Sequence, residues 1–447
     1  MPSILLLGSG FVADPCLSYL LKRPENKITV AARRVANVTN LIAGRPNASA
    51  IALDVNDDAA LEAAVAKHDV VISLIPYTHH ARVIKAAVKH KKHVVTTSYI
   101  SPAMMEHDQA AKDAGITVMN EIGVDPGIDH LYAIKTIDEV HALGGKITSF
   151  TSYCGGLPAP ESSNNPLGYK FSWSSRGVLL ALRNNAKCVE DGKIVDIPGP
   201  ELMNSAKNIP IYPAFAFEGY PNRDSTPYNE RYHIPEAKTV IRGTLRYAGF
   251  PKFINALVKL GFLEDKEVAS LAPTAAPVQW RDLLAQQAGI SFSTVDTLEA
   301  AVRKTANLSG EDGERIIFGM KWLGMFSETN VHLRGTLLDT LCATLEDKMM
   351  YAPGERDMVM LQHRFGVEFP NGKKEIRTST GLWFGVPNGD SAMATTVGVP
   401  CGIATQLILD GKISRRGVIA PMDKEINNPI LEALEKEGIF MVDEIIA

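Results

Sequence analysis

The sequence has few cysteines, and they are spaced neither for disulfide bonds nor for a metal. Cys16, Cys154, Cys188, Cys342 and Cys401 are far apart and odd in number. Disulfide-rich domains and zinc sites both need closely spaced cysteines, so neither is predicted. We therefore expect a protein of a reducing compartment, the cytoplasm, without a metal centre.

The sequence also lacks an excess of positive charge and any long hydrophobic run. Its 46 Lys and Arg residues against 50 Asp and Glu give a formal net charge of −4, whereas a nucleic-acid-binding domain is normally basic. The apolar run that begins at Ile4 is too short to span a bilayer and lacks a basic leader. We expect no nucleic-acid or membrane partner, so single arginines are interpreted as parts of local sites.

The first 130 residues alternate apolar strands with amphipathic helices. NDDAALEAAVAKH and THHARVIKAAVKHK have helical periodicity, and SPAMMEHD begins a third helix that Ser101 caps and Gly115 ends. This repetition predicts a doubly wound, Rossmann-like parallel sheet with helices on both faces. The runs with the length and β-branched content of buried parallel strands are 4–7, 28–32, 50–53, 70–75, 93–96 and 116–119.

The remaining sequence predicts two further domains, since 447 residues exceed a single hydrophobic core. Longer strands are predicted at 146–155, 209–220, 239–248 and 357–383, the last with a hairpin turn at PNGK. We predict an α/β protein of three domains. They are a Rossmann-like domain (1–130 with a C-terminal return, 391–447), a second α/β domain with a mixed sheet (131–250 and 347–390) and a small all-helical insert (251–346).

A dinucleotide-binding motif follows the first predicted strand. LLLGSGFVA contains G-x-G-x-x-A at Gly8, Gly10 and Ala13, directly before a helix. Gly8 permits the tight turn, Gly10 lets the backbone approach a diphosphate, and Ala13 allows close helix–strand contact. The diphosphate is expected on the amides of residues 9–12 at the positive end of the helix. The alternative is a glycine turn that binds nothing.

The end of the second strand lacks the acid that usually binds a ribose hydroxyl. ITVAARR places Arg33 and Arg34 there instead. Guanidinium groups match a phosphate with paired charge-assisted hydrogen bonds, so NADP(H) is the predicted cofactor. Alternatively, one or both arginines are solvated charges. Further strand ends, at 53–55, 74–76, 96–99 and 123–126, face the same crevice in such a sheet. Asp54 is able to cap the following helix there, a role that does not exclude a contact with the nucleotide.

Long segments of the chain resemble one enzyme family. They include SLIPYTHHARVIKAAVKHKKHVVTTSYISP, SYCGGLPAPESSNNPLGYKFSW, YPNRDSTPYNERY and IRGTLRYAGFPKFI. Together they resemble the fungal saccharopine reductases, the NADP-dependent, L-glutamate-forming saccharopine dehydrogenases. The resemblance covers nearly the whole chain and is weaker at 262–330 and 381–390.

The resemblance implies an oxidoreductase of lysine biosynthesis, in the α-aminoadipate pathway, that is a homodimer. L-Glutamate condenses with 2-aminoadipate 6-semialdehyde, and NADPH reduces the resulting imine to saccharopine, reversibly. The implied cofactor contacts are Ser9, Gly10, Phe11, Val12, Ala32, Arg33, Arg34, Asp54, Val55, Ile75, Thr97, Ser98, Val124, Asp125, Pro126 and Ser174. The implied saccharopine contacts are Ser98, Tyr99, Asp125, Arg223, Thr244, Leu245 and Arg246.

This chemistry needs cations for three carboxylates and groups that move protons. Arg223 and Arg246 are the carboxylate ligands that the resemblance implies, although the residues alone favour ordinary surface charges. Tyr99, Asp125 and Cys154 are the candidates for proton transfer. Asp125 alternatively stabilises its Asp-Pro-Gly turn, and Cys154 alternatively fills apolar space. His79 and His80 are expected to have capping or surface roles.

Two rival functions remain at this stage. A carboxynorspermidine-type reductase also reduces an imine made from an amine and a semialdehyde, but it needs fewer carboxylate ligands. A non-catalytic NADP-sensing protein would use the same nucleotide domain without a polar substrate pocket.

Arg33→Asp tests the cofactor prediction. The substitution should raise the KM for NADPH far more than the KM for NADH, because an acid repels the 2′-phosphate and accepts from the ribose hydroxyls. Initial rates with each cofactor measure this. Equal changes for the two cofactors would show that Arg33 does not bind the 2′-phosphate.

Overall fold

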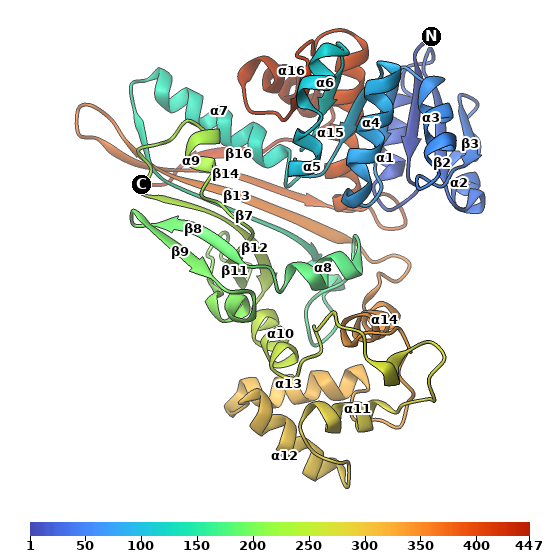
Figure 1. Ribbon diagram of the computed structural model, residues 1–447. Coiled ribbons are helices and arrows are strands. Elements are labelled where there is room, and N and C mark those ends of the chain that lie inside the picture. Colours follow the sequence, from blue (N-terminus) through green and yellow to red (C-terminus); the bar gives the residue numbers. More distant parts are fainter. The chain divides into compact units, whose positions relative to one another are not determined.

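The computed structural model describes residues 1–447, which fall into two units (Figure 1). Unit 1 contains Met1–Ile147 and Val367–Ala447, and unit 2 contains Thr148–Gly366. The segment 251–346, predicted as a helical insert, lies within unit 2. A further subdivision of unit 2 into a strand-rich and a helical domain remains a proposal.

A seven-stranded parallel sheet in the order β15-β6-β5-β4-β1-β2-β3 forms the centre of unit 1. This order confirms the doubly wound fold, with the switch point between β1 and β4. All six predicted strands are present; the seventh, a three-residue strand near the C-terminus, was not predicted. The strands are β1 (Ser3–Leu7), β2 (Lys27–Ala32), β3 (Ala48–Ala52), β4 (Val70–Ser73), β5 (His93–Thr96), β6 (Thr117–Met119) and β15 (Gly417–Ile419).

Helices connect these strands, and their caps follow the sequence in most places. Ser101 caps its helix as predicted, because its hydroxyl accepts from the Met104 amide at 3.3 Å. The single helix predicted after Ser101 is divided into two short helices, α5 and α6. Asp57, not Asp54, caps α3 through the Ala60 amide. The helices are α1 (Ala13–Leu20), α2 (Val35–Ile42), α3 (Asp58–Ala66), α4 (His80–His90), α5 (Pro102–Met105), α6 (Asp108–Asp113) and α7 (Ile128–Ala142); a 3₁₀ turn, Tyr77–His79, precedes α4.

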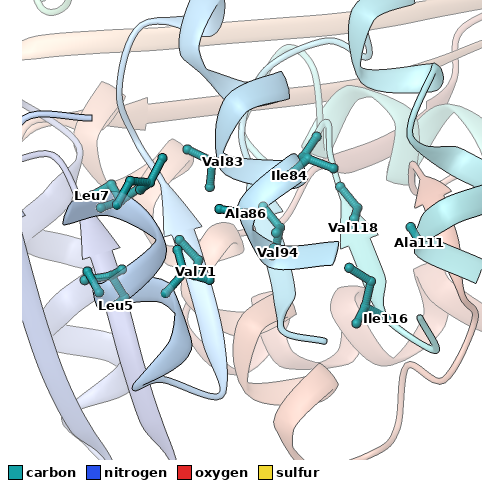
Figure 2. Packing of buried hydrophobic residues seen from close by; sticks show 14 of the residues in the cluster. Leu5, Leu7, Val71, Val83, Ile84, Ala86, Val94, Ala111, Ile116 and Val118 are labelled. Carbon is teal, nitrogen blue, oxygen red and sulfur yellow. The ribbon is translucent and has the colours of Figure 1, made fainter. Parts of the chain in front are cut away.

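Alternate side chains of the strands build the core of unit 1. Leu5 and Leu7 of β1 point to one face of the sheet, where Val83 and Ile84 of α4 cover them. Figure 2 shows these residues meeting Val71, Val94 and Val118 of the neighbouring strands. Each such fully buried side chain contributes about 1.5–3 kcal/mol by leaving water. The sheet is therefore fixed firmly enough to place the loops at its carboxyl edge.

The C-terminal part of unit 1 lies against its N-terminal helices. α15 (Ala392–Leu409) lies beside α1, and α16 (Lys424–Lys436) lies against α15 (Figure 1). α15 is long and apolar enough to cross a membrane, but 83% of it is buried inside the protein, as in a core helix. Gly398 lets the two helices approach, because a Cβ there would lie 2.6 Å from the Val12 carbonyl oxygen and 2.9 Å from the Cys16 amide.

Unit 1 also contains a strand pair outside the parallel sheet. β14 (Lys374–Phe384) pairs antiparallel with β16 (Val442–Ile445). Before β14, the Phe369 amide donates to the Lys373 carbonyl at 2.9 Å and Gly372 has φ +81°. A turn therefore lies at the predicted PNGK position.

Unit 2 combines a mixed sheet with helices. The sheet order is β10-β11-β12-β7-β13; β12 is parallel to β7 and antiparallel to β11, and β8 pairs with β12 and β9. The strand predicted at 209–220 is wrong for most of its length, because only 217–221 and the two residues 207–208 are extended. The strands are β7 (Lys146–Pro158), β8 (Ala186–Glu190), β9 (Lys193–Ile197), β10 (Lys207–Asn208), β11 (Phe217–Pro221), β12 (Thr239–Tyr247) and β13 (Asp357–Glu368).

Most of the helices of unit 2 lie in the segment 251–346, which was predicted to be helical. This segment contains α10, α11, α12, α13 and the beginning of α14. The helices are α8 (Ser175–Ala181), α9 (Tyr228–Arg231), α10 (Phe250–Lys259), α11 (Trp280–Gln287), α12 (Val295–Ala306), α13 (Gly310–Leu323) and α14 (Leu337–Met349).

Gly398→Ala should destabilise the protein by about 1–3 kcal/mol, because its methyl group would displace backbone atoms of α1. Urea denaturation gives the free energy of unfolding. Thr395→Ala, at a partly exposed position of the same helix, is the matched control and should change it by about 0.5 kcal/mol or less. Equal values for the two variants would contradict the close approach of α15 and α1.

Candidate nucleotide and substrate sites

The glycine turn after β1 has the geometry that its motif predicts. Gly8 has φ +111°, and a Cβ there would lie 2.5 Å from the Leu74 carbonyl oxygen, so only glycine fits. Around Gly10 no atom lies within 4 Å of the Cβ position, so open space borders the backbone there. The Gly8 amide donates to the Ala31 carbonyl at 2.9 Å, which continues the pairing of β1 with β2 up to the start of the turn.

The amides that follow Gly8 are available to a ligand. Those of residues 9–12 donate to no protein acceptor, and no side chain caps α1. Helix N-termini with free amides bind anions, because the amide hydrogens and the helix dipole both favour negative charge. The residues present therefore fit the diphosphate of a dinucleotide.

Arg33 and Arg34 follow β2 at the same edge of the sheet. Both are exposed, and neither forms an ion pair or a side-chain hydrogen bond with the protein. Arg34 occupies the N-cap position of α2 without a capping side chain. Two adjacent arginines without protein anions fit the 2′-phosphate of NADP(H).

The other predicted nucleotide contacts lie at strand ends, with one exception. Ile75 borders the Gly8 turn, its Cγ2 being 3.6 Å from the Gly8 Cβ position, and Thr97 borders Gly123. Asp54 accepts from the Asn56 amide at 2.9 Å and so stabilises its own turn. Ser174 belongs to unit 2, where it caps α8 by accepting from the Gly177 amide at 3.2 Å.

Two of the candidate proton-transfer residues lie together after β5 and β6. The Tyr99 hydroxyl donates to Asp125 Oδ1 at 2.6 Å. Asp125 sits in a tight loop closed by the Gly123 amide, which donates to the Pro126 carbonyl at 2.8 Å, and the Asp125–Pro126 peptide is cis. A phenol bonded to a half-buried carboxylate can exchange a proton with a substrate amine.

Buried polar side chains hold both of these loops in place from the interior of the protein. Glu121 and His130 are 1% and 0% exposed, and His130 Nε2 lies 2.8 Å from Glu121 Oε2. Glu121 Oε1 accepts from the Ile100 amide at 3.1 Å, next to Tyr99. Asp129 Oδ1 accepts from the Gly127 amide at 2.5 Å, close to Asp125. Sequence patterns did not single out this network, because Glu121 lies 8 residues before Asp129 and 9 before His130, outside the helix that carries both.

His80 corrects a sequence prediction. It was expected to cap a helix or lie at the surface, yet it is 1% exposed. Its Nδ1 lies 2.9 Å from the Ser73 hydroxyl, and its Nε2 lies 2.9 Å from the hydroxyl of Ser98. Burial, and secondarily the neighbouring His79, lowers the pKa of His80 to about 4. The helical pattern could not show that the first residue of α4 faces inward, toward two strand ends.

Arg246 is the most informative residue of the predicted substrate site in unit 2. It is 6% exposed and makes no ion pair; its Nη1 donates to the Leu245 carbonyl at 2.7 Å, and its Nε has no acceptor. The guanidinium lies 4.8 Å from the ring centroid of Tyr169 and 5.4 Å from that of Phe250. Burying a cation without an anion is costly, so Arg246 is suited to an incoming carboxylate.

The neighbours of Arg246 on β12 divide between the two faces of the sheet. Thr244 shares its face and pairs in register with Cys154 of β7 and Tyr220 of β11. Cys154 is buried and, like the other four cysteines, forms no disulfide bond. The side chain of Leu245 points to the opposite face, so only its main chain is available on the Arg246 face. Arg223 is exposed, with φ +47°.

Comparisons with known proteins decide the family. Residues 4–119 match the saccharopine dehydrogenase NADP binding domain, and residues 123–439 match the saccharopine dehydrogenase C-terminal domain. Over 447 residues the chain is 60% identical to the saccharopine dehydrogenase (NADP(+), L-glutamate-forming) of Schizosaccharomyces pombe, covering 100% of this chain and 99% of that protein. The chain belongs to the saccharopine dehydrogenase family.

Further relatives show how far the family extends. The Saccharomyces cerevisiae saccharopine dehydrogenase (NADP(+), L-glutamate-forming) is 54% identical over 100% of this chain and 99% of that protein. A solved structure, apo saccharopine dehydrogenase (L-Glu forming) from Saccharomyces cerevisiae, superposes with a TM-score of 0.92 over 100% of both chains at 53% identity. The mitochondrial alpha-aminoadipic semialdehyde synthase of Bos taurus is 42% identical over 98% of this chain but only 47% of that protein.

These findings confirm the family resemblance, the α/β fold and NADP(H) as the cofactor of this saccharopine dehydrogenase family member. The nucleotide-binding residues 4–119 include the Gly8 turn and both arginines. The individual contact residues remain predictions, supported by the amides and cations that lack protein partners.

His80 should make stability depend on pH. Since its pKa is about 4 in the folded protein and about 6.5 when unfolded, the unfolded chain binds a proton first as the pH falls. Above pH ~6.5, His80 leaves the free energy of unfolding unchanged. Between pH ~6.5 and ~4, it lowers the free energy of unfolding by at most about 1.4 kcal/mol for each pH unit that the pH falls.

Urea denaturation at several pH values between 7 and 5 measures this dependence. His80→Gln should give a shallower slope of unfolding free energy against pH than the wild type, whatever its absolute stability. Parallel slopes would contradict a buried, neutral His80.

Proposed function

We propose that this chain catalyses the reversible, NADPH-dependent condensation of L-glutamate with 2-aminoadipate 6-semialdehyde to saccharopine. The full-length relatives that are 54–60% identical carry this activity in their names. The reaction places the enzyme in lysine biosynthesis by the α-aminoadipate route. The family match favours this function over a carboxynorspermidine-type reductase and over an NADP sensor.

One structural observation carries the substrate side of the proposal. Arg246 is a buried cation that the protein supplies with aromatic rings and one carbonyl but no carboxylate. Saccharopine has three carboxylates, and a guanidinium shielded from water binds a carboxylate with strong charge-assisted hydrogen bonds. An NADP sensor has no use for such a group.

The cofactor site binds and orients the nucleotide through main-chain and cationic groups. We propose that the amides of residues 9–12 hold the diphosphate and that Arg33 and Arg34 hold the 2′-phosphate. Bound NADPH supplies the hydride that reduces the imine carbon. Ile75, Thr97 and the loop 124–126 would border the rest of the nucleotide.

We assign proton handling to the pair Tyr99 and Asp125. Imine formation removes a proton from the ammonium of glutamate and gives one to the departing hydroxyl. When Tyr99 Oη accepts the proton of the ammonium, the 2.6 Å hydrogen bond lets Asp125 receive the phenolic proton. The reverse transfer returns a proton through Tyr99 to the departing hydroxyl. Cys154 is assigned a supporting position beside Thr244. Ser98, Thr244 and Arg223 are assigned to substrate binding, with Leu245 contributing only its main chain.

We further propose that the protein is a cytoplasmic homodimer. The homodimer rests on the family resemblance, and the compartment is supported by five buried cysteines that form no disulfide bond. Light scattering at several protein concentrations tests the assembly.

The proposed reaction is tested by mixing the protein with NADP⁺ and saccharopine at alkaline pH and following nicotinamide absorbance. Intact NADP⁺ binding without an absorbance change would favour the sensor. Turnover with a carboxynorspermidine-type substrate that is insensitive to replacement of Arg223 would favour the other reductase.

Arg246→Met should raise the KM for saccharopine by about 10- to 100-fold, since a lost hydrogen bond to a charged group costs about 1.5–3 kcal/mol. The KM for NADP⁺ should change much less. Arg303→Met is the matched control, because Glu299 and Glu314 already bind that guanidinium at 2.7 and 2.9 Å. Unchanged KM values for saccharopine in both variants would remove Arg246 from the substrate site.

A further inference from the structure

The imidazole of His80 connects two serine hydroxyls at the carboxyl ends of neighbouring strands. Ser73 is the last residue of β4, and Ser98 lies two residues after the end of β5. His80 begins α4 and reaches both hydroxyls, at 2.9 Å each. Ser73 and His80 are 0% and 1% exposed, whereas Ser98 is half-buried. The imidazole thus bonds a candidate ligand-binding residue from its buried side.

The partners of Ser73 determine which nitrogen of His80 carries the proton. His80 Nδ1 is the sole hydrogen-bond partner of the Ser73 hydroxyl. A hydroxyl has one donor and two acceptor lone pairs, and a buried donor without an acceptor is costlier and rarer than an unused lone pair. Ser73 therefore donates to Nδ1. In a neutral imidazole the proton then sits on Nε2, which donates to Ser98 Oγ.

This arrangement leaves Ser98 with one unused donor. Its main-chain amide donates to Thr96 Oγ1 at 3.2 Å, and its carbonyl accepts from the Glu121 amide at 3.1 Å. Its Oγ accepts from His80, so the hydroxyl hydrogen and one acceptor lone pair remain for a ligand. A carboxylate is an acceptor-only group and requires such a donor.

We propose that His80 is a positioning residue that fixes the Ser98 hydroxyl as a hydrogen-bond donor to a carboxylate oxygen of saccharopine. The inference rests on the proposed role of Ser98 in substrate binding. His80 itself touches no substrate. It acts by orienting Ser98 before the substrate arrives, so that binding costs less ordering of the hydroxyl.

A double-mutant cycle with His80→Gln and Ser98→Ala tests the proposal. Each single variant should raise the KM for saccharopine about tenfold, the effect of one lost hydrogen bond to a charged group. The double variant should be no worse than Ser98→Ala, because His80 acts through the Ser98 hydroxyl. Ser98→Thr retains a hydroxyl and should recover most of the affinity, and circular dichroism checks that each variant is folded.

The outcomes distinguish the role of His80 from the proposed role of Ser98 in substrate binding, on which it depends. If Ser98→Ala leaves the KM for saccharopine unchanged, the role of Ser98 itself is wrong. If Ser98→Ala weakens binding but the two substitutions are additive, His80 has only a structural role and the inference fails alone.

Nitrogen-15 NMR of the wild-type protein gives a test that needs no variant. With ¹⁵N-labelled histidine, the ring of His80 should show the Nε2-protonated tautomer. The Nδ1-protonated tautomer would overturn the proposal, because Ser98 would then donate to His80 and not to the substrate.

Discussion

Buried polar side chains that must find partners inside the protein hold the carboxyl edge of the parallel sheet in unit 1. An unpaired polar group in the interior costs several times what a satisfied one contributes. His80 therefore joins β4 to the residues after β5, and Glu121 with His130 and Asp129 joins those residues to the loop after β6. Each of these buried groups has few alternative hydrogen-bond partners nearby. The loops therefore have little conformational freedom. A site built on them is ordered before any ligand arrives, which lowers the entropic cost of binding.

Several of the groups assigned to ligands are ones that the protein does not satisfy itself. Many arginines of the protein are paired with acids; for example, Arg176 bonds Asp265 and Asp339, and Arg183 bonds Glu264. Arg33, Arg34 and Arg246 lack anions, and the amides after Gly8 lack acceptors. A folded chain that pairs its polar groups elsewhere leaves such exceptions where function requires them. For Arg246 the exception is strong, because the charge is also buried.

The sequence predicted the strands of unit 1 well, because long β-branched runs between turns have few alternative structures. The Gly8 turn and the arginines after β2 were also predictable, since strand, turn and helix are adjacent in the chain. Features that depend on distant contacts were not. β15 has only three residues and forms by pairing with β6. α7 is buried along most of its length and shows no amphipathic pattern. Likewise, the burial of His80 depends on strand ends 7 and 18 residues away.

The contact at Gly398 joins α1 and α15, two helices that lie far apart in the sequence. α1 presents the amides of the nucleotide motif, yet its other side lies against a helix that begins at Ala392. During synthesis on the ribosome, the N-terminal strands and helices emerge long before that helix does. The helix after the glycine turn therefore keeps an uncovered apolar side until residues 392–409 have been translated, so the nucleotide domain can close only after that later segment has emerged.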